Sequence, residues 1–152
     1  MSNIKEIILK NEKAMNERWN KGDYSGFLDC YVDEVTFVDP GVPSMVQSRE
    51  EIREKLEMNF PYKEFPIVKS EYSNEKVVVS DGEDMAVLTY NLHNSMQSKS
   101  GKLLQLPLWH CTQVYQLIQG EWRIIHNHWS FAQVPELMER VQAIFTEAAK
   151  ED

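Results

Sequence analysis

The segment from Gly120 to Phe131 constrains the fold of this chain more than any other. It follows a polar turn and alternates, yet each set of alternate residues mixes large apolar side chains with hydrogen-bonding ones. Side chains of a strand point to opposite sides with a period of two, so a strand wetted on one side would separate apolar from polar residues. The pattern therefore predicts a strand buried on both faces. We expect one face to border a pocket with polar groups and the other to contact a partner surface.

Length and charge indicate an ordinary globular domain. The 152 residues suit one hydrophobic core, and we expect a single domain over residues 1–152. The net charge of −8 argues against nucleic acid or an anionic membrane as a partner, because both bind basic surfaces. No apolar run approaches the roughly 20 residues of a spanning helix, and we recognise no signal peptide. We therefore expect a cytoplasmic protein in which Cys30 and Cys111 are free thiols.

Helical spacing marks the N-terminal third of the chain. Apolar residues recur at this spacing from Ile4 to Trp19, after a possible cap at Asn3, and Gly22 ends the helix. Asp23 can cap a second, shorter helix that buries Phe27, Leu28 and Tyr31.

Two further helices are expected later in the chain. Ser48 to Glu51 is a capping box that opens a helix closed by Pro61. Pro135 begins a last helix, because its ring is tolerated in a first turn. The apolar face of that helix holds Leu137, Met138, Val141, Ile144, Phe145 and Ala148.

The remaining segments read as strands. Their ranges are Val35–Asp39, Ile67–Val79, Met85–Met96, Lys102–Ile118 and Gly120–Phe131. Helices first and long antiparallel strands afterwards are typical of an α+β domain with helices on one face of a curved sheet. Such a sheet forms a cone that can hold a small molecule.

Two segments resemble the nuclear transport factor 2-like superfamily, which includes SnoaL-like proteins and steroid delta-isomerase. Asn20 to Pro40 is similar to the helix–helix–strand opening of the isomerase. Gln113 to His128 resembles the closing hairpin of SnoaL-like proteins and of the association domain of calcium/calmodulin-dependent kinase II. The resemblance covers roughly residues 4–131 and implies a cone-shaped, cystatin-like fold, to which the last helix is an addition. It is specific for the fold rather than for an activity, because this fold hosts many functions.

The resemblance also implies roles for particular positions. Asp39 falls on the general base of the isomerase, which moves a proton between carbons of an apolar substrate. The tyrosine and the protonated aspartate of the isomerase's oxyanion hole fall on Met15 and Cys111, which lack strong donors. We therefore do not expect classical steroid isomerisation. The one histidine and three arginines that bind carboxylates in the association domain correspond to Ile52, Asn91, Gln113 and Trp129.

Strand parity, oriented by the resemblance, predicts the lining of the cone. The candidate ligand-binding residues are Met15, Trp19, Tyr31, Asn91, His93, Trp109, Cys111, Gln113, Asn127 and Trp129. Indole walls with amide or imidazole groups suit a neutral, partly aromatic or alicyclic ligand with one or two oxygens. Pro107 could introduce a bulge that shifts this parity. The alternative is a filled core whose polar groups satisfy one another.

Other chemistries are less well supported. Asp39 precedes Pro40 and Gly41, so it could simply cap a turn. His126 and His128, with His110 nearby, invite a metal site, but catalytic zinc needs three protein ligands and the resemblance places these histidines on the outer face. We expect no metal and no cofactor. Cys111 is read as a buried thiol rather than a nucleophile.

Two functions remain open at this point. One is a cofactor-independent isomerase, cyclase or dehydratase in which Asp39 is the general base and the polar lining residues orient an oxygen. The other is a non-catalytic module that binds a ligand or associates with other chains. In either case we expect a homodimer through the outer faces of the sheets, which are apolar enough to mark an interface. That outer face would hold Leu104, Leu106, Leu108, His110, Thr112, Val114, Trp122, Ile124, His126 and His128.

Overall fold

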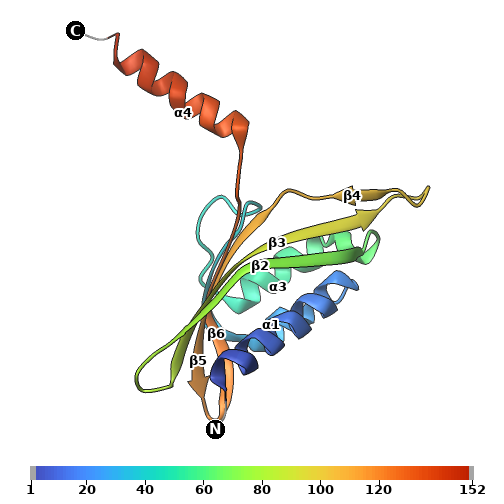
Figure 1. The fold of residues 1–152 in the computed structure, drawn as a ribbon, viewed down its shortest axis with the longest axis vertical. Coiled ribbons are helices and arrows are strands. Elements are labelled where there is room, and N and C mark those ends of the chain that lie inside the picture. Colours follow the sequence, from blue (N-terminus) through green and yellow to red (C-terminus); the bar gives the residue numbers. More distant parts are fainter. Residues whose placement is uncertain (1–2, 151–152) are drawn as a thin grey trace.

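The fold is a curved, six-stranded mixed sheet with helices against one face (Figure 1). The computed structural model describes residues 3–150. The strands are β1 (Tyr31–Val38), β2 (Ile67–Val79), β3 (Met85–Gln97), β4 (Leu103–Gln105), β5 (Trp109–Ile118) and β6 (Glu121–Phe131). They lie in the order β1-β6-β5-β3-β2, with β4 beside β3, and only the β1–β6 pairing among these is parallel. This confirms the α+β, cone-shaped architecture expected from the sequence.

The helices begin and end largely where capping chemistry predicts. They are α1 (Ile4–Asn20), α2 (Ser25–Cys30), α3 (Arg49–Met58) and α4 (Pro135–Ala148), with a short 3-10 turn, η1, at Pro61–Lys63. The side chains of Asn3 and Ser48 each accept the backbone N–H three residues later, at 3.3 Å. Gly22 follows α1 with φ 96°, a conformation that costs glycine little. Tyr31, however, begins β1 instead of extending α2.

Register shows which side chains of the central strands face the helices. Leu88, Tyr90 and Leu92 of β3 lie opposite Gln113, Cys111 and Trp109 of β5, and residues directly opposite each other share a face. Leu88, Tyr90 and Leu92 are buried in the core. The intervening Asn91 and His93 therefore face outward, and the prediction that they line the cone is wrong. The larger apolar side chains take the inner positions because burying them removes more apolar surface from water.

Because of a bulge in β6, the residues on the outer face differ from those predicted. Val114 pairs with His126, whereas the next residue of β5, Tyr115, pairs with Ile124, so Ile125 is extra. Ile124 is consequently fully buried in the core, not on the outer face. Trp122 also packs partly against the core. The outer side of β5 and β6 thus keeps His110, Thr112, Val114, His126 and His128.

The predicted long strand over residues 102–118 is interrupted. Pro107 lies in the segment between β4 and β5, because proline has no N–H to donate to a ladder. Leu106 and Leu108 therefore lie outside the strands, while the backbone N–H of Leu106 still donates to the carbonyl of Asn94 at 2.8 Å.

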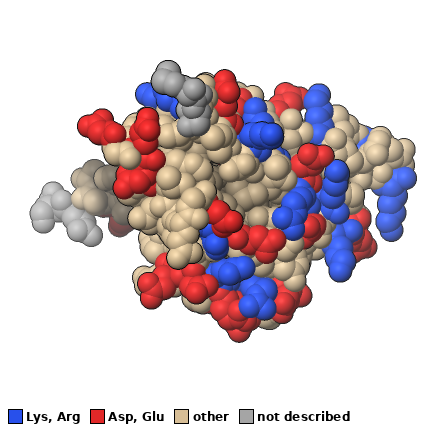
Figure 2. Space-filling view, turned by 90° about the horizontal axis from the view of Figure 1, so that it is seen from below, with Lys and Arg blue, Asp and Glu red and all other residues tan. Residues whose placement is uncertain are grey.

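α4 stands away from the rest of the molecule, at the end of the chain that leaves β6 (Figure 1). Its apolar residues are exposed, including Ile144 at 68% and Phe145 at 66%. Within residues 3–150, no helix is both long enough and apolar enough to cross a membrane. Figure 2 shows Lys and Arg interspersed with Asp and Glu over the face it presents.

Candidate functional site

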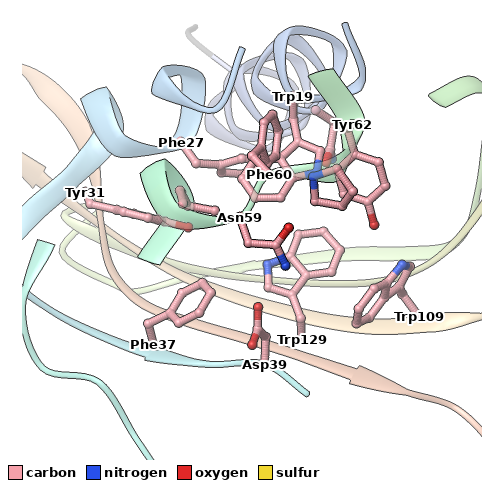
Figure 3. Close-up of a pocket in the computed structure, with 13 residues that line it drawn as sticks. Trp19, Phe27, Tyr31, Phe37, Asp39, Asn59, Phe60, Tyr62, Trp109 and Trp129 are labelled. Atoms are coloured by element: carbon pink, nitrogen blue, oxygen red, sulfur yellow. The ribbon is translucent and has the colours of Figure 1, made fainter. Parts of the chain in front are cut away.

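A cavity of about 200 Å3 lies between the helices and the inner face of the sheet. A cavity of about 150 Å3 lined by apolar side chains can hold benzene, so this space suits a molecule of one or two rings. Its lining residues come from α1, α2, β1 and the residue that follows it, the end of α3 and its connection to β2, β5 and β6 (Figure 3). They are Asn16, Trp19, Phe27, Tyr31, Phe37, Asp39, Leu56, Asn59, Phe60, Pro61, Tyr62, Trp109 and Trp129.

Edge-to-face aromatic contacts hold the walls of the cavity. The Trp109 and Trp129 rings have centroids 5.7 Å apart at 84°, and Trp19 meets Phe60 at 4.6 Å and 75°. This geometry places the positive edge of one ring against the negative face of the next, which favours fixed ring orientations. The walls of the cavity are therefore preorganised by contacts within the protein.

Asp39 supplies a half-buried carboxylate to this aromatic cavity. It follows β1 directly, and in Figure 3 its carboxylate lies beside Trp129. Its Oδ1 accepts the backbone N–H of Gly41 at 2.7 Å, so the residue caps the turn and lines the cavity at once. Burial raises the pKa of Asp39, while the N–H groups of Gly41 and Val42 oppose the rise.

The structure brings together some of the predicted ligand-binding residues and not others. Trp19, Tyr31, Trp109 and Trp129 line the cavity. Met15, Asn91, His93, Cys111, Gln113 and Asn127 do not.

Four of the six residues outside the cavity lie in the packed core or on the outer side of the sheet, and the other two belong to a buried polar cluster described below. Met15 and Cys111 belong to the packed core, and burial raises the pKa of the Cys111 thiol well above its ordinary value. The Asn91 amide donates to the Trp109 carbonyl at 3.0 Å and lies 2.7 Å from His110 Nδ1, beside the outward-facing strand positions. His93 lies opposite Glu71 on β2.

Sequence reasoning missed the segment that covers the cavity. Leu56, Asn59, Phe60 and Tyr62 come from the end of α3 and the connection to β2. The only signal was their composition, since two aromatic residues flank Pro61 where a helix ends. Asn16 was also missed, although it lies one helical turn before Trp19 on the same face of α1.

Gln113 and Asn127 belong to a buried polar cluster centred on Glu12 of α1. Glu12 is only 1% exposed and accepts hydrogen bonds from the Tyr90 hydroxyl at 2.6 Å, the Gln113 amide at 3.0 Å and the Tyr115 hydroxyl. Burial raises the pKa of Glu12, and these three donors oppose the rise. In this part of the interior, therefore, the core is filled and its polar groups satisfy one another, which was the alternative to a polar-lined pocket.

The histidines of the outer face make contacts that do not require a metal. His126 Nδ1 lies 2.6 Å from the Thr36 hydroxyl, and the His126 and His128 rings have centroids 6.3 Å apart. Burial lowers the pKa of His126, and the neighbouring His128 lowers it further. Across residues 3–150, no group of three or more His, Cys, Asp or Glu side chains is placed to hold a metal ion.

The fold and the cavity define a nuclear transport factor 2-like cone. The chain matches the SnoaL-like domain over residues 11–134 and therefore belongs to that family. No curated protein matches it.

Solved structures agree with this assignment. A candidate ketosteroid isomerase from Parabacteroides distasonis is 28% identical with a TM-score of 0.66, covering 90% of this chain and 92% of its own. A candidate calcium/calmodulin-dependent protein kinase II association domain from Xanthomonas campestris is 24% identical with a TM-score of 0.68, covering 90% and 91%. An NTF2-like protein with a cystatin-like fold from Novosphingobium aromaticivorans is 10% identical with a TM-score of 0.67, covering 88% and 84%. The latter two support the fold alone.

Proposed function

We propose that this protein binds a small, neutral, largely apolar molecule in the cone and acts on it without a cofactor. Asp39 is the general base of an isomerisation, cyclisation or dehydration. The observation that carries the proposal is a half-buried carboxylate in an aromatic cavity, whose pKa is raised by burial. A base is most effective when its pKa approaches the working pH, so this rise makes the carboxylate a better proton acceptor.

The preference for a neutral ligand follows from the charges of the cavity. Among its lining residues in the described part of the chain, Asp39 is the single formally charged side chain, and none is Lys, Arg or His. A ligand carboxylate would lie near Asp39 with no cation among the lining residues. Lys55 lowers the pKa of Asp39 only from outside the lining, and a buried charge without a close partner is costly. The likeness to a candidate ketosteroid isomerase supports the same class of ligand.

Two measurements test this proposal. Thermal-shift screening compares neutral cyclic ketones and alcohols with small dicarboxylates; stabilisation by the dicarboxylates alone would overturn the proposed ligand class. Proton abstraction is then followed by NMR as deuterium exchange into a bound carbon acid. Asp39→Asn is expected to lose exchange, whereas Asp33→Asn, an exposed carboxylate on the same β1 strand, keeps it. Equal exchange in both variants would remove Asp39 from the reaction.

The second candidate function is an association module that forms a homodimer. The specific observation is the outer side of β5 and β6, where Val114 and Thr112 lie opposite His126 and His128, together with the exposed apolar face of α4. Association domains have the same fold, which is compatible with this candidate. Light scattering at micromolar concentration tests it, because a monomer of about 17.8 kDa at neutral pH would exclude the dimer.

A further inference from the structure

The buried cluster around Glu12 is continuous with the cavity. Beyond Gln113, the chain of hydrogen bonds continues from the Asn127 amide to the Gln113 carbonyl oxygen, and from the Tyr31 hydroxyl to the Asn127 carbonyl oxygen at 3.1 Å. Gln113 and Asn127 are fully buried, and Tyr31 is 3% exposed and lines the cavity. In Figure 3 the Tyr31 hydroxyl points towards the middle of the cavity. A change at Glu12 therefore has a path of direct contacts to the ligand site.

Every hydrogen bond in this path has a fixed direction. An ionised carboxylate can only accept, so Gln113 must turn its N–H groups towards Glu12. Its carbonyl oxygen then faces Asn127, which must donate to it. The carbonyl oxygen of Asn127 is left for Tyr31, whose single O–H donates to it. Tyr31 has no hydrogen left for a ligand.

The direction does not depend on whether Glu12 holds a proton on its other oxygen. Gln113 and Tyr90 both donate to Oε2, and Tyr115 donates to Oε1. A proton on Oε1 would change only the bond with Tyr115, because Oε2 would still accept from Gln113. The Tyr31 hydroxyl itself stays neutral, since burial raises its pKa well above the ordinary value.

We infer that Glu12, acting through Gln113 and Asn127, makes Tyr31 a hydrogen-bond acceptor in the cavity, which selects an alcohol over the matching ketone. This inference rests on the proposed function, in that it assumes the cavity binds a neutral ligand. An alcohol can donate to the free lone pair of Tyr31, whereas a ketone oxygen would face it with two acceptors and no proton. Glu12 is thus a positioning residue for ligand specificity and does not touch the ligand.

The substitution Glu12→Gln reverses the path in a way that hydrogen-bond counting predicts. The new amide nitrogen has two hydrogens, and the Oε2 position has two partners, Tyr90 and Gln113. With the nitrogen there, one hydrogen goes to the Gln113 carbonyl oxygen and the other to the Tyr90 oxygen. The Tyr90 hydrogen then loses its acceptor at position 12 and turns to the Cys111 sulfur, while the remaining amide oxygen still accepts from Tyr115. The opposite orientation would leave an N–H and the Tyr115 hydroxyl without partners, which is costly in the interior.

Reversal at Gln113 is transmitted to the cavity. Gln113 turns its carbonyl oxygen towards the new amide and donates to Asn127, and Asn127 then donates to Tyr31. The O–H of Tyr31 is released to the cavity as a donor. A single change in α1 therefore removes the preference for alcohols, because a donating Tyr31 hydroxyl can bond a ketone oxygen as well as an alcohol oxygen.

The experiment measures the affinities of 1-indanol and 1-indanone, a matched pair of neutral two-ring molecules. Binding is followed by the fluorescence of the cavity tryptophans and confirmed by titration calorimetry. We expect the unsubstituted protein to prefer the alcohol by roughly 2- to 10-fold for the Tyr31 contact, the range of one net hydrogen bond. Tyr31→Phe should reduce this preference by lowering alcohol affinity, whereas Glu12→Gln should reduce it by raising ketone affinity. Glu17→Gln, the same change on the exposed side of α1, should leave both affinities unaltered.

The outcomes separate this inference from the proposed function. Equal effects of Tyr31→Phe on both ligands, or an unchanged preference in folded Glu12→Gln, would overturn the inference while the cavity remains a neutral-ligand site. Failure of both molecules to bind the unsubstituted protein would count against both proposals. If Glu12→Gln does not fold, as checked by circular dichroism, the Tyr31→Phe comparison decides. A purely structural role for Glu12 predicts parallel losses for the two ligands, not a changed ratio.

Discussion

Replacing Gln113 with Leu removes the central link of the buried path without creating a large cavity, because the two side chains are similar in size. Glu12 loses one donor, and the Asn127 amide loses its acceptor. Glu12 keeps the Tyr90 and Tyr115 hydroxyls, so the Asn127 amide is the group left without a partner. An orphaned buried polar group costs about 1–3 kcal/mol, and the free energy of unfolding should fall by about that amount. For a protein of this length, the lower bound corresponds to a fall in Tm of roughly 2–4 °C.

Urea unfolding followed by tryptophan fluorescence gives the free energy directly. Gln116→Leu is the matched control, since Gln116 lies on the same strand but points to the opposite, outer side. The control should change stability by less than about 0.5 kcal/mol. A loss for Gln113→Leu no larger than that of the control would refute the claim that these buried amides are held by specific hydrogen bonds.

Three further predictions concern other parts of the molecule. Because burial raises the pKa of Asp39 in the folded state, its contribution to stability is full below about pH 4, where an unfolded aspartate titrates, and is lost as pH rises through the folded pKa. Asp39→Asn should therefore flatten part of that decline in urea midpoints measured across pH, and an unchanged slope would contradict the assignment. The lowered pKa of His126 gives the reverse sign for folding, so its contribution to stability is lost as pH falls below about 6.5. Charging His126 and His128 inside an interface costs desolvation energy, so a homodimer held through them should dissociate in acid, and light scattering that shows a constant mass would argue against it. The double change Ile144→Asp and Phe145→Asp should alter the unfolding free energy by under about 0.5 kcal/mol in urea, because both side chains are exposed; a larger loss would mean that α4 packs on the body.

The fold could be predicted because its signals are local. Caps at Asn3 and Ser48 and the glycine after α1 depend on neighbouring residues, so their boundaries can be read from short segments. The strand assignments depend on alternation, which is equally local. Where a strand prediction failed, at residues 106–108, the reason was also visible, since Pro107 cannot donate to a ladder.

The lining of the cavity depends on register, which alternation does not contain. The sequence-based prediction turned the face of β3 that holds Asn91 and His93 towards the cavity. This placed every side chain of the strand on the wrong side, because a shift of one residue moves every side chain to the other face. The bulge at Ile125 likewise places Ile124 on the inner face of the sheet, whereas the prediction placed it on the outer face. Both the facing of a strand and the position of a bulge depend on how the strands pair and pack on the helices, so they are settled only by the folded sheet.

The sequence is sufficient to predict that Glu12 is buried, but it is not sufficient to predict which groups Glu12 bonds. It lies four residues after Ile8 and four before Asn16, on the face of α1 that also carries Met15 and Trp19. That spacing places the carboxylate against the sheet. Its hydrogen-bond donors come from β3 and β5, about eighty to a hundred positions later in the chain, and helical periodicity carries no information about them.

The parallel pairing of β1 with β6 also determines the order in which the chain can fold. Tyr31 is paired with Ile124, and the Arg123 guanidinium, 92 positions beyond Tyr31, donates to its carbonyl at 2.7 Å. Contacts of such long sequence separation form slowly, because the loop between them must be closed first. Synthesis adds about 5–20 residues per second, so β1 spends several seconds outside the ribosome before its neighbour exists. Until β6 emerges, the unpaired edge of β1 is open to strands of other chains, and a nascent chain stalled before residue 121 is exposed to aggregation.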